Sequence, residues 1–413
     1  MARLTRRSTL GLLSGSALAA PFIRRASAAD EKSVTIGIDL PFTGAQAATA
    51  GLVREGVMTA IDAANANGGV AGYHLNALTL DDGTATAGQY DPAQAATNAR
   101  KMVSDPSVVA AIGPMNSGSG KAMSPILSRG GLAIISPSST NPDLTSPKFA
   151  AIYRPAGVPV FFRTVTTDAY QGPNMANFFA DTLKLKSVYV LDDSGAYGVG
   201  LADSFEAQAR KKGMQVLGRD RLDPAQADYS AALTKIKSLG AQAIYAGGDA
   251  QAGVKLVKQS YDIVPNVVKA GGDGFYAPEI LIGGGFPAAD GWYATIASPH
   301  VLDDAAVAPF LKHFIEKYGH QPADYSITAY DGTLVIIDAI ERAAKSGPVT
   351  RAAVRDAIQT AKVKTLQGEV SFDANGDLAS RIVSVFQIKR NDAFPLNDVI
   401  HQFKYVGVAP QES

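Results

Sequence analysis

The chain has 413 residues, 46% of them hydrophobic and 18% charged, which is ordinary for a folded globular protein but too long for one compact core, so two domains are expected. The formal net charge is +0, so no excess of positive charge points to nucleic acid. Cysteine is absent, which excludes disulfides, thiol nucleophiles and thiolate metal sites.

The first 28 residues have the organisation of an export signal. After a basic start, an apolar stretch runs from Gly11 to Phe22, and Ala26-Ser27-Ala28 matches the small-x-small cleavage pattern. The stretch is much shorter than the roughly 20 residues that span a bilayer. The pair Arg6-Arg7 favours the twin-arginine route over the general secretory route. We therefore expect cleavage after Ala28 and a periplasmic protein. Loss of five arginines leaves 33 basic and 38 acidic residues, a balance that disfavours nucleic acid.

Short apolar segments then alternate with segments of helical periodicity. The pattern predicts strands at 34–38, 74–82, 107–114 and 132–137. It predicts one helix from Leu52 to a stop at Gly68-Gly69, and another from Asp91, a typical N-cap followed by proline, to Val103. Strands that alternate with helices in this way are typical of a parallel sheet covered on both faces.

The same alternation begins again at residue 187. It predicts a helix ended by Gly213, with strands or strand ends at 187–193, 214–220, 242–249 and 266–274. Two long helices are expected at 309–319 and 326–347. Residues 368–390 alternate around Asn375-Gly376, which predicts a β-hairpin. The chain is therefore predicted to be an α/β protein with two similar units.

Sequence motifs for catalysis and ion binding are incomplete or absent. The segment that resembles a phosphate-binding loop has Met115 and Ala122 where glycine and a hydroxyl residue are required. The segment that resembles a calcium loop has Leu378 and Ser384 where glycine and glutamate are required. No G-x-S-x-G elbow is present, and the five histidines lack metal-ligand spacing. We therefore expect no enzyme activity, no metal and no cofactor.

Hydroxyl side chains follow two neighbouring predicted strands, at Ser117 and at Ser138, Ser139 and Thr140. Ligands of open parallel sheets bind beyond the carboxyl ends of such strands. Hydroxyls and backbone N–H groups can hold a carboxylate without a basic side chain. Asp273, in the second unit, can neutralise an ammonium, so the pattern suits an α-amino acid. The alternative is that these residues only form turns, in which Ser, Thr and Asp are common.

The chain also contains, in order, eight segments that recur in one family, among them "GIDLPFTG", "AAIGPMNSGS", "ISPSSTNPDLT", "VLDDSGAYGVGLADSF" and "AIYAGGDAQAG". Together they closely resemble the periplasmic leucine/isoleucine/valine-binding protein family, the substrate-binding proteins of ABC importers. The resemblance implies two doubly wound parallel-sheet lobes joined by a three-segment hinge, the type I periplasmic-binding fold. It places lobe 1 at 29–166 and 299–380, and lobe 2 at 167–298 and 381–413.

The resemblance also implies ligand-binding positions. It places the residue that binds the ligand's carboxylate at Ser117 and the residue that pairs with the ligand's ammonium at Asp273. The loop that contains Ser138, Ser139 and Thr140 would supply a carbonyl to the ammonium and a threonine to both ends of the ligand. A tyrosine that reaches in from the second lobe falls on Tyr197, and an aromatic wall of the side-chain pocket falls on Tyr325.

Three positions depart from the family pattern. Thr49 and Asp249 stand where the family has tyrosines, and Asp273 stands where the branched-chain binder has glutamate. The residues that bind the ligand's ammonium and carboxylate are retained, whereas the side-chain pocket differs from that of a strict leucine binder. A ligand with a further polar or cationic group is therefore an open alternative.

The function that the resemblance implies is an exported, monomeric solute-binding protein. It would capture an amino acid, of branched-chain type or related, and deliver it to the membrane permease of an ABC importer. Alternatives are a sensory or regulatory module of the same fold, a transport binder for an aromatic carboxylate or an amide, and an exported enzyme. A receptor ectodomain would need a membrane anchor, and no apolar stretch of 18 or more residues follows the signal.

Overall fold

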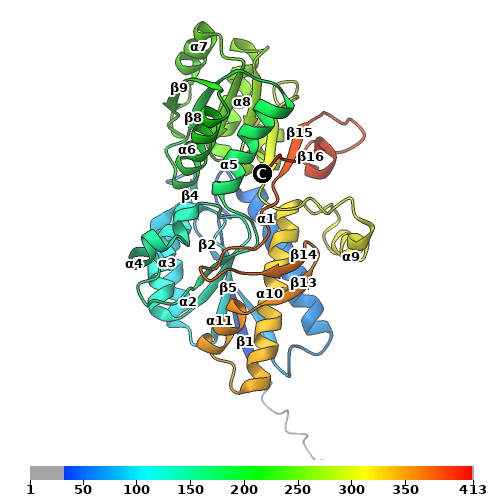
Figure 1. Ribbon diagram of the computed structural model, residues 1–413. Helices are drawn as coiled ribbons and strands as arrows, with labels where there is room; N and C mark the ends of the chain where they lie inside the picture. The colour runs from blue at the N-terminus through cyan, green and yellow to red at the C-terminus, as the bar shows by residue number, and fades with distance from the viewer. Residues whose placement is uncertain (1–31, 412–413) are drawn as a thin grey trace, which may run out of the picture. The chain divides into compact units, whose positions relative to one another are not determined.

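Two large sheets organise the chain (Figure 1). The computed structural model describes residues 32–411, and the expected export signal with its cleavage site lies outside the described residues. Residues from Lys32 onward form one compact unit that contains both sheets.

The first sheet has five parallel strands in the order β2-β1-β5-β6-β7. Their bounds are β1 Ser33–Leu40, β2 His74–Asp81, β5 Val108–Ile112, β6 Ala133–Ser136 and β7 Phe161–Arg163. Every residue of β5, β6 and β7 is buried, as the apolar sequence runs predict for parallel strands covered on both faces. The strand order reverses between β1 and β5, so the loops that follow these two strands open at a switch point where ligands bind.

The second sheet has seven strands in the order β16-β15-β12-β11-β10-β8-β9. The parallel strands are β8 Ser187–Asp192, β9 Gln215–Arg221, β10 Ala243–Gly247, β11 Val268–Gly271 and β12 Tyr293–Ile296. Two antiparallel strands, β15 Ser384–Ile388 and β16 Phe403–Val408, complete one edge. The strand order reverses between β8 and β10, which gives this sheet a switch point of its own.

Helices cover both sheets. Those next to the first sheet are α1 Ala47–Ala66, α2 Pro92–Ser104, α3 Ser117–Gly130, α10 Asp324–Ser346 and α11 Arg351–Gln359. Those next to the second are α5 Asp168–Asn177, α6 Ala196–Lys211, α7 Ser230–Leu239 and α8 Ala250–Ile263. The predicted N-cap of α2 is confirmed, because Asp91 accepts hydrogen bonds from the N–H groups of Ala93 and Gln94.

Shorter elements fill the connections. The strands and helices are β3 Gly83–Thr84, β4 Gln89–Tyr90, α4 Ala150–Tyr153, α9 Ala308–Tyr318, β13 Lys362–Thr365, β14 Gly368–Ser371 and α12 Val399–Gln402. Short 3₁₀ turns lie at Pro142–Leu144, Pro147–Phe149, Asp273–Phe275 and Ala305–Val307, and π turns at Phe178–Thr182 and Ile280–Gly284.

The chain passes between the two sheets three times, after β7, after β12 and after β14. The N–H of Thr166 donates to the carbonyl of Ala297 at 2.7 Å, so the first two crossings lie side by side. This is the three-segment hinge that the resemblance implies. The residues at which one lobe ends and the next begins stay a prediction.

The β-hairpin predicted for residues 368–390 is wrong. β14 pairs with β13, whereas β15 pairs with β12 and β16 in the other sheet. The turn at Asn375-Gly376 does form, with Gly376 at φ +100°, but it closes only a single bridge between Phe372 and Leu378. The alternation on the two sides of the turn therefore reflects two different sheets, because the third crossing lies between them.

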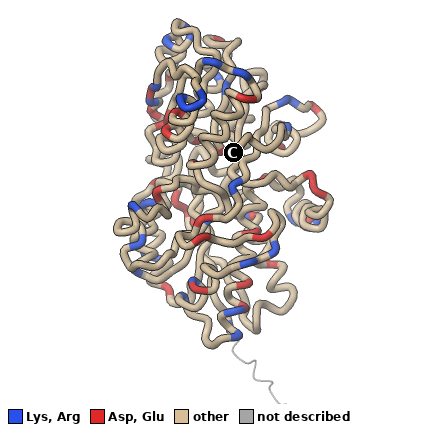
Figure 2. The backbone as a smooth tube through the Cα atoms, viewed as in Figure 1, with Lys and Arg blue, Asp and Glu red and all other residues tan. Residues whose placement is uncertain are grey.

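Charge is distributed over the chain without a single dominant sign. Figure 2 shows acidic and basic residues interspersed along the described backbone. Among residues 32–411, no helix is both long enough and apolar enough to cross a membrane. The same residues contain no cluster of three or more histidine or acidic side chains that could hold a metal ion.

Candidate functional site

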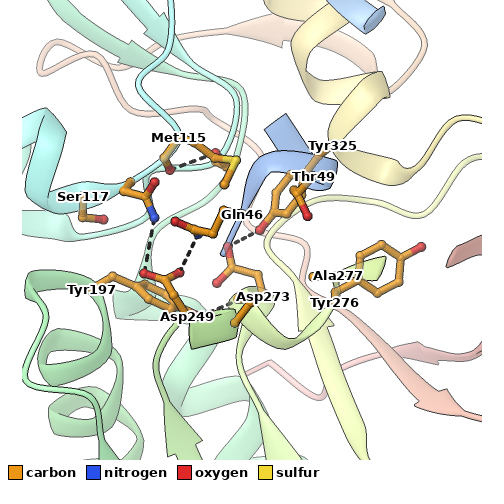
Figure 3. Close-up of a pocket in the computed structure, with 14 residues that line it drawn as sticks. Gln46, Thr49, Met115, Ser117, Tyr197, Asp249, Asp273, Tyr276, Ala277 and Tyr325 are labelled. Atoms are coloured by element: carbon orange, nitrogen blue, oxygen red, sulfur yellow. Dashed lines mark hydrogen bonds between the residues drawn. The ribbon is translucent and has the colours of Figure 1, made fainter. Parts of the chain in front are cut away.

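A pocket lies where loops at the strand ends of the first sheet meet those of the second (Figure 3). Seven predicted site residues line it: Thr49, Ser117, Ser138, Tyr197, Asp249, Asp273 and Tyr325. Ser139 and Thr140 do not line it; both are buried, 1% and 0% exposed. The structure therefore brings together most of the residues that the sequence singled out.

Ser117 lies at the N-terminus of a helix. It is the first residue of α3, which follows β5 after a short loop. The preceding residue, Asn116, makes no side-chain cap, so the first turn of α3 keeps N–H groups without an intrahelical partner. Such a terminus favours a negative group, and the pocket at Ser117 is suited to a carboxylate.

The loop of Ser138 and Ser139 is tied to the loop before α3. The Ser138 hydroxyl donates to the carbonyl of Met115 at 2.9 Å, and the Ser139 hydroxyl donates to that of Pro114 at 3.1 Å. Both N–H groups donate to the hydroxyl of Ser136, at 3.3 and 2.8 Å. These hydroxyls therefore fix the shape of the pocket wall, a structural role related to the turn-forming alternative that the sequence left open.

Arg163 holds the other side of this loop, and sequence reasoning missed it. Its side chain is fully buried and donates to the carbonyls of Ser139 at 2.8 Å and Asn141 at 3.1 Å. It also donates to the Thr145 hydroxyl at 2.7 Å and forms an ion pair with Asp377 at 2.8 Å. The signal available in the sequence was a single charge inside the apolar run VFFRTV.

Asp273 begins the turn that follows β11. One carboxylate oxygen accepts from Gln171 Nε2 at 3.1 Å. The other accepts from the hydroxyl of Tyr325 (Figure 3). The N–H of Asp273 returns a bond of 3.1 Å to Gln171 Oε1. Burial raises the pKa of Asp273, and the hydrogen bonds from Tyr197, Tyr325 and Gln171 oppose that rise. Gln171 was not anticipated, because a single glutamine carries no sequence pattern.

Asp249 occupies the N-cap position of α8, yet its side chain does not cap that helix. Its Oδ1 accepts from Gln46 Nε2 at 3.2 Å, and its Oδ2 accepts from Asn116 Nδ2 at 3.3 Å. Its N–H donates to Asp193 at 3.0 Å. Burial, followed by the charges of Asp193 and Asp273, raises the pKa of Asp249 well above its usual range.

Thr49 forms its hydrogen bonds with an acid outside the pocket lining. Its N–H and hydroxyl donate to the carboxylate of Glu279, at 2.9 and 2.7 Å. Asn141 in turn donates to the carbonyl of Ala196 at 2.7 Å. Both pairs join the first-sheet side of the pocket to the second-sheet side, so the loops around the pocket are in direct polar contact.

The charged side chains that line the pocket are all acidic. The lining includes two acids and no lysine, arginine or histidine. A further buried acid, Asp168, lies close behind, and burial together with the charge of Asp273 raises its pKa to about 8. The arrangement attracts a ligand with positive charge and opposes one whose only charge is negative.

These features define a two-lobed ligand-binding protein with a polar pocket between its sheets. The model of the family described as "Periplasmic binding protein" matches residues 33–393, and the chain belongs to that family. The match confirms the resemblance seen in the sequence, and the structural neighbours confirm the type I periplasmic-binding fold.

Among relatives, the Leu/Ile/Val-binding protein homolog 3 of Brucella melitensis is 34% identical over 92% of this chain and 97% of its own length. The leucine-, isoleucine-, valine-, threonine- and alanine-binding protein of Pseudomonas aeruginosa is 29% identical over 89% of this chain and 92% of its own. A leucine binding protein from Thermotoga maritima has a similar structure, with a TM-score of 0.77 and 27% identity over 91% of this chain and 98% of its own.

Proposed function

We propose that this protein binds an α-amino acid between its lobes, in the periplasm, and delivers it to the membrane permease of an ABC importer. The proposal rests on one observation: Asp273 and Ser117 line the same pocket, and that lining has no basic side chain. Asp273 supplies negative charge for an ammonium. Ser117 supplies a hydroxyl and a helix N-terminus for a carboxylate.

The relatives support the same ligand class, since those from Brucella melitensis and Pseudomonas aeruginosa are named for branched-chain amino acids. A binding protein rather than an enzyme also fits the failure of every catalytic motif in the sequence. The export signal expected in the first 28 residues supports the periplasmic location, and we expect a monomer.

The alternative of an aromatic carboxylate is disfavoured by the acids of the pocket. Such a ligand carries one negative charge and no positive charge, so it would meet Asp249 and Asp273 without a compensating cation. A neutral amide escapes this repulsion but leaves the helix N-terminus at Ser117 without an anion.

The test is a thermal-shift screen of the purified protein, unfolded and refolded to remove any co-purified ligand. The panel contains branched-chain, polar and basic amino acids, urea and short amides, and aromatic carboxylates. A ligand at 100 times its dissociation constant adds about 2.7 kcal/mol to the free energy of unfolding, which gives a clear rise in melting temperature. A rise with α-amino acids is expected. A rise only with compounds that lack an ammonium would overturn the proposal.

A further inference from the structure

The end of the pocket at Asp249 has more hydrogen-bond acceptors than donors. Both oxygens of Asp249 accept from side-chain amides, those of Gln46 and Asn116. These bonds use the amide nitrogens, so the two amide oxygens remain available as acceptors. Gln46 Oε1 and Asn116 Oδ1 are both buried and have no hydrogen-bond partner among the described residues. All three residues line the pocket.

Buried acceptors without a donor are costly, at about 1–3 kcal/mol each, and most are satisfied in folded proteins. A carboxylate and two unpartnered amide oxygens therefore form a site for a group with several N–H donors. An ammonium has three donors and a guanidinium has five. An apolar side chain placed here would leave both amide oxygens without a partner.

Local structure does not account for the carboxylate of Asp249. Aspartate at an N-cap normally accepts from the first turn of its own helix, and Asp249 does not. The neighbouring turn also approaches it closely. A Cβ added to Gly274 would lie 3.1 Å from Asp249 Oδ1 and 2.4 Å from the carbonyl of Gly248. The backbone thus holds this carboxylate beside the turn that carries Asp273.

The charge count of the pocket points the same way. An amino acid with an apolar side chain brings one ammonium and one carboxylate, so it adds no net charge to a lining with two acids and no base. Burial raises the pKa of both acids, and the charges of Asp193 and Asp273 raise that of Asp249 further. A second cation on the ligand would offset the repulsion at Asp249.

On the basis of the proposed function, we propose that the amino acid bound here carries a second cationic group at the end of its side chain, as lysine, ornithine and arginine do. Asp249, with the amide oxygens of Gln46 and Asn116, would select that group. Asp273 would keep the α-ammonium, so each acid of the pocket would have its own cation.

Calorimetric titration of the refolded, ligand-free protein tests this with two matched ligand pairs. L-Norleucine has the chain of L-lysine without the ε-ammonium, and L-citrulline replaces the guanidinium of L-arginine with a neutral urea group. We expect at least one basic amino acid to bind 100-fold or more tightly than its neutral partner. Asp249→Asn should reduce that ratio at least tenfold. The matched control is Asp262→Asn, the same change at an exposed position of the same helix.

Each other outcome has a distinct meaning. Tight binding of leucine or norleucine, with lysine and arginine weaker, would overturn this inference and leave the proposed function standing. Equal binding of arginine and citrulline, with lysine no tighter than norleucine, would overturn it too, because a second cationic group would then add nothing. If no α-amino acid binds, the proposed function fails. Melting curves without ligand report whether Asp249→Asn folds, and if it does not, the wild-type ratios decide.

Discussion

The hydroxyl of Tyr276 donates a hydrogen bond of 2.6 Å to the carboxylate of Asp324. The next residue along α10, Tyr325, donates to Asp273, three residues before Tyr276. Two hydrogen bonds of opposite direction therefore join the turn after β11 to the N-terminus of α10. Because Asp273 and Tyr325 line the pocket, contact with a ligand and contact between the two sheets' loops involve the same residues.

Tyr276→Phe should weaken ligand binding by about 1–3 kcal/mol, because one buried oxygen of Asp324 loses its donor while the ring keeps its packing. Calorimetric affinity measures this for the ligand found in the screen. Tyr261→Phe, at an exposed position 44% accessible, is the control. Unchanged affinity and unchanged melting temperature in Tyr276→Phe would show that this hydrogen bond contributes neither to ligand binding nor to stability.

His300 should make stability depend on pH. Its ring contacts Asp324 at 2.9 Å and Asp303 at 3.3 Å and packs against Phe386 and Tyr405. Burial lowers the pKa of His300, but the hydrogen bonds and charges of these two acids outweigh burial and raise it. The protonated ring is thus favoured in the folded state. Its stabilisation is complete below the unfolded pKa of about 6.5 and is lost as pH rises through the folded value.

His300→Gln should therefore lower the melting temperature more at pH 5.5 than at pH 9. His313→Gln, on the exposed side of α9, should show no such difference. Equal losses for His300→Gln at both pH values would contradict the linkage.

Asp168→Asn should remove a second pH dependence, of the same sign as that of His300. The pKa of Asp168 is raised to about 8 by burial and by Asp273, while an unfolded aspartate titrates near 3.9. The folded protein holds an extra proton between these values, so wild-type stability falls as pH rises through that window. As pH rises through that window, the free energy of unfolding of the variant should increase relative to that of the wild type by up to about 1.4 kcal/mol per pH unit. Urea unfolding at pH 5, 6.5 and 8 measures this, and parallel profiles would refute it.

Ser117→Ala and Thr140→Ala should each cost roughly 1–3 kcal/mol in binding, the scale of a hydrogen bond to a charged group. Ser117 lines the pocket, whereas Thr140 is buried and outside its lining, so the two variants also show how far the ligand reaches. The measurement is calorimetric affinity, with Ser238→Ala on the exposed side of α7 as control. Near-zero effects from both would remove the carboxylate assignment.

Asp273→Ala should weaken amino-acid binding by several kcal/mol, because a buried ammonium would lose its partner. Titration with the amino acid and with its deaminated analogue separates the two roles of the residue. A loss that is equal for both ligands would mean that Asp273 shapes the pocket without pairing with the ammonium.

The sequence predicted the sheets, most helices and half of the pocket lining, because apolar periodicity and the loop motifs are local signals. The N-cap at Asp91 and the hydroxyls after β5 and β6 are examples. It did not predict Gln46, Asn116 or Gln171 as partners of the acids, since a lone amide acquires its role only from tertiary contacts. The hairpin at Asn375-Gly376 failed for a related reason: turn chemistry is local, but strand pairing across sheets is not.

Arg163 has a consequence for kinetics. One fully buried guanidinium holds the carbonyls of Ser139 and Asn141 and is paired with Asp377, immediately before the third crossing between the sheets. The wall of the pocket and a hinge segment thus share a single side chain. We therefore expect substitution of Arg163 to change the residence time of a bound ligand and the opening rate of the hinge together.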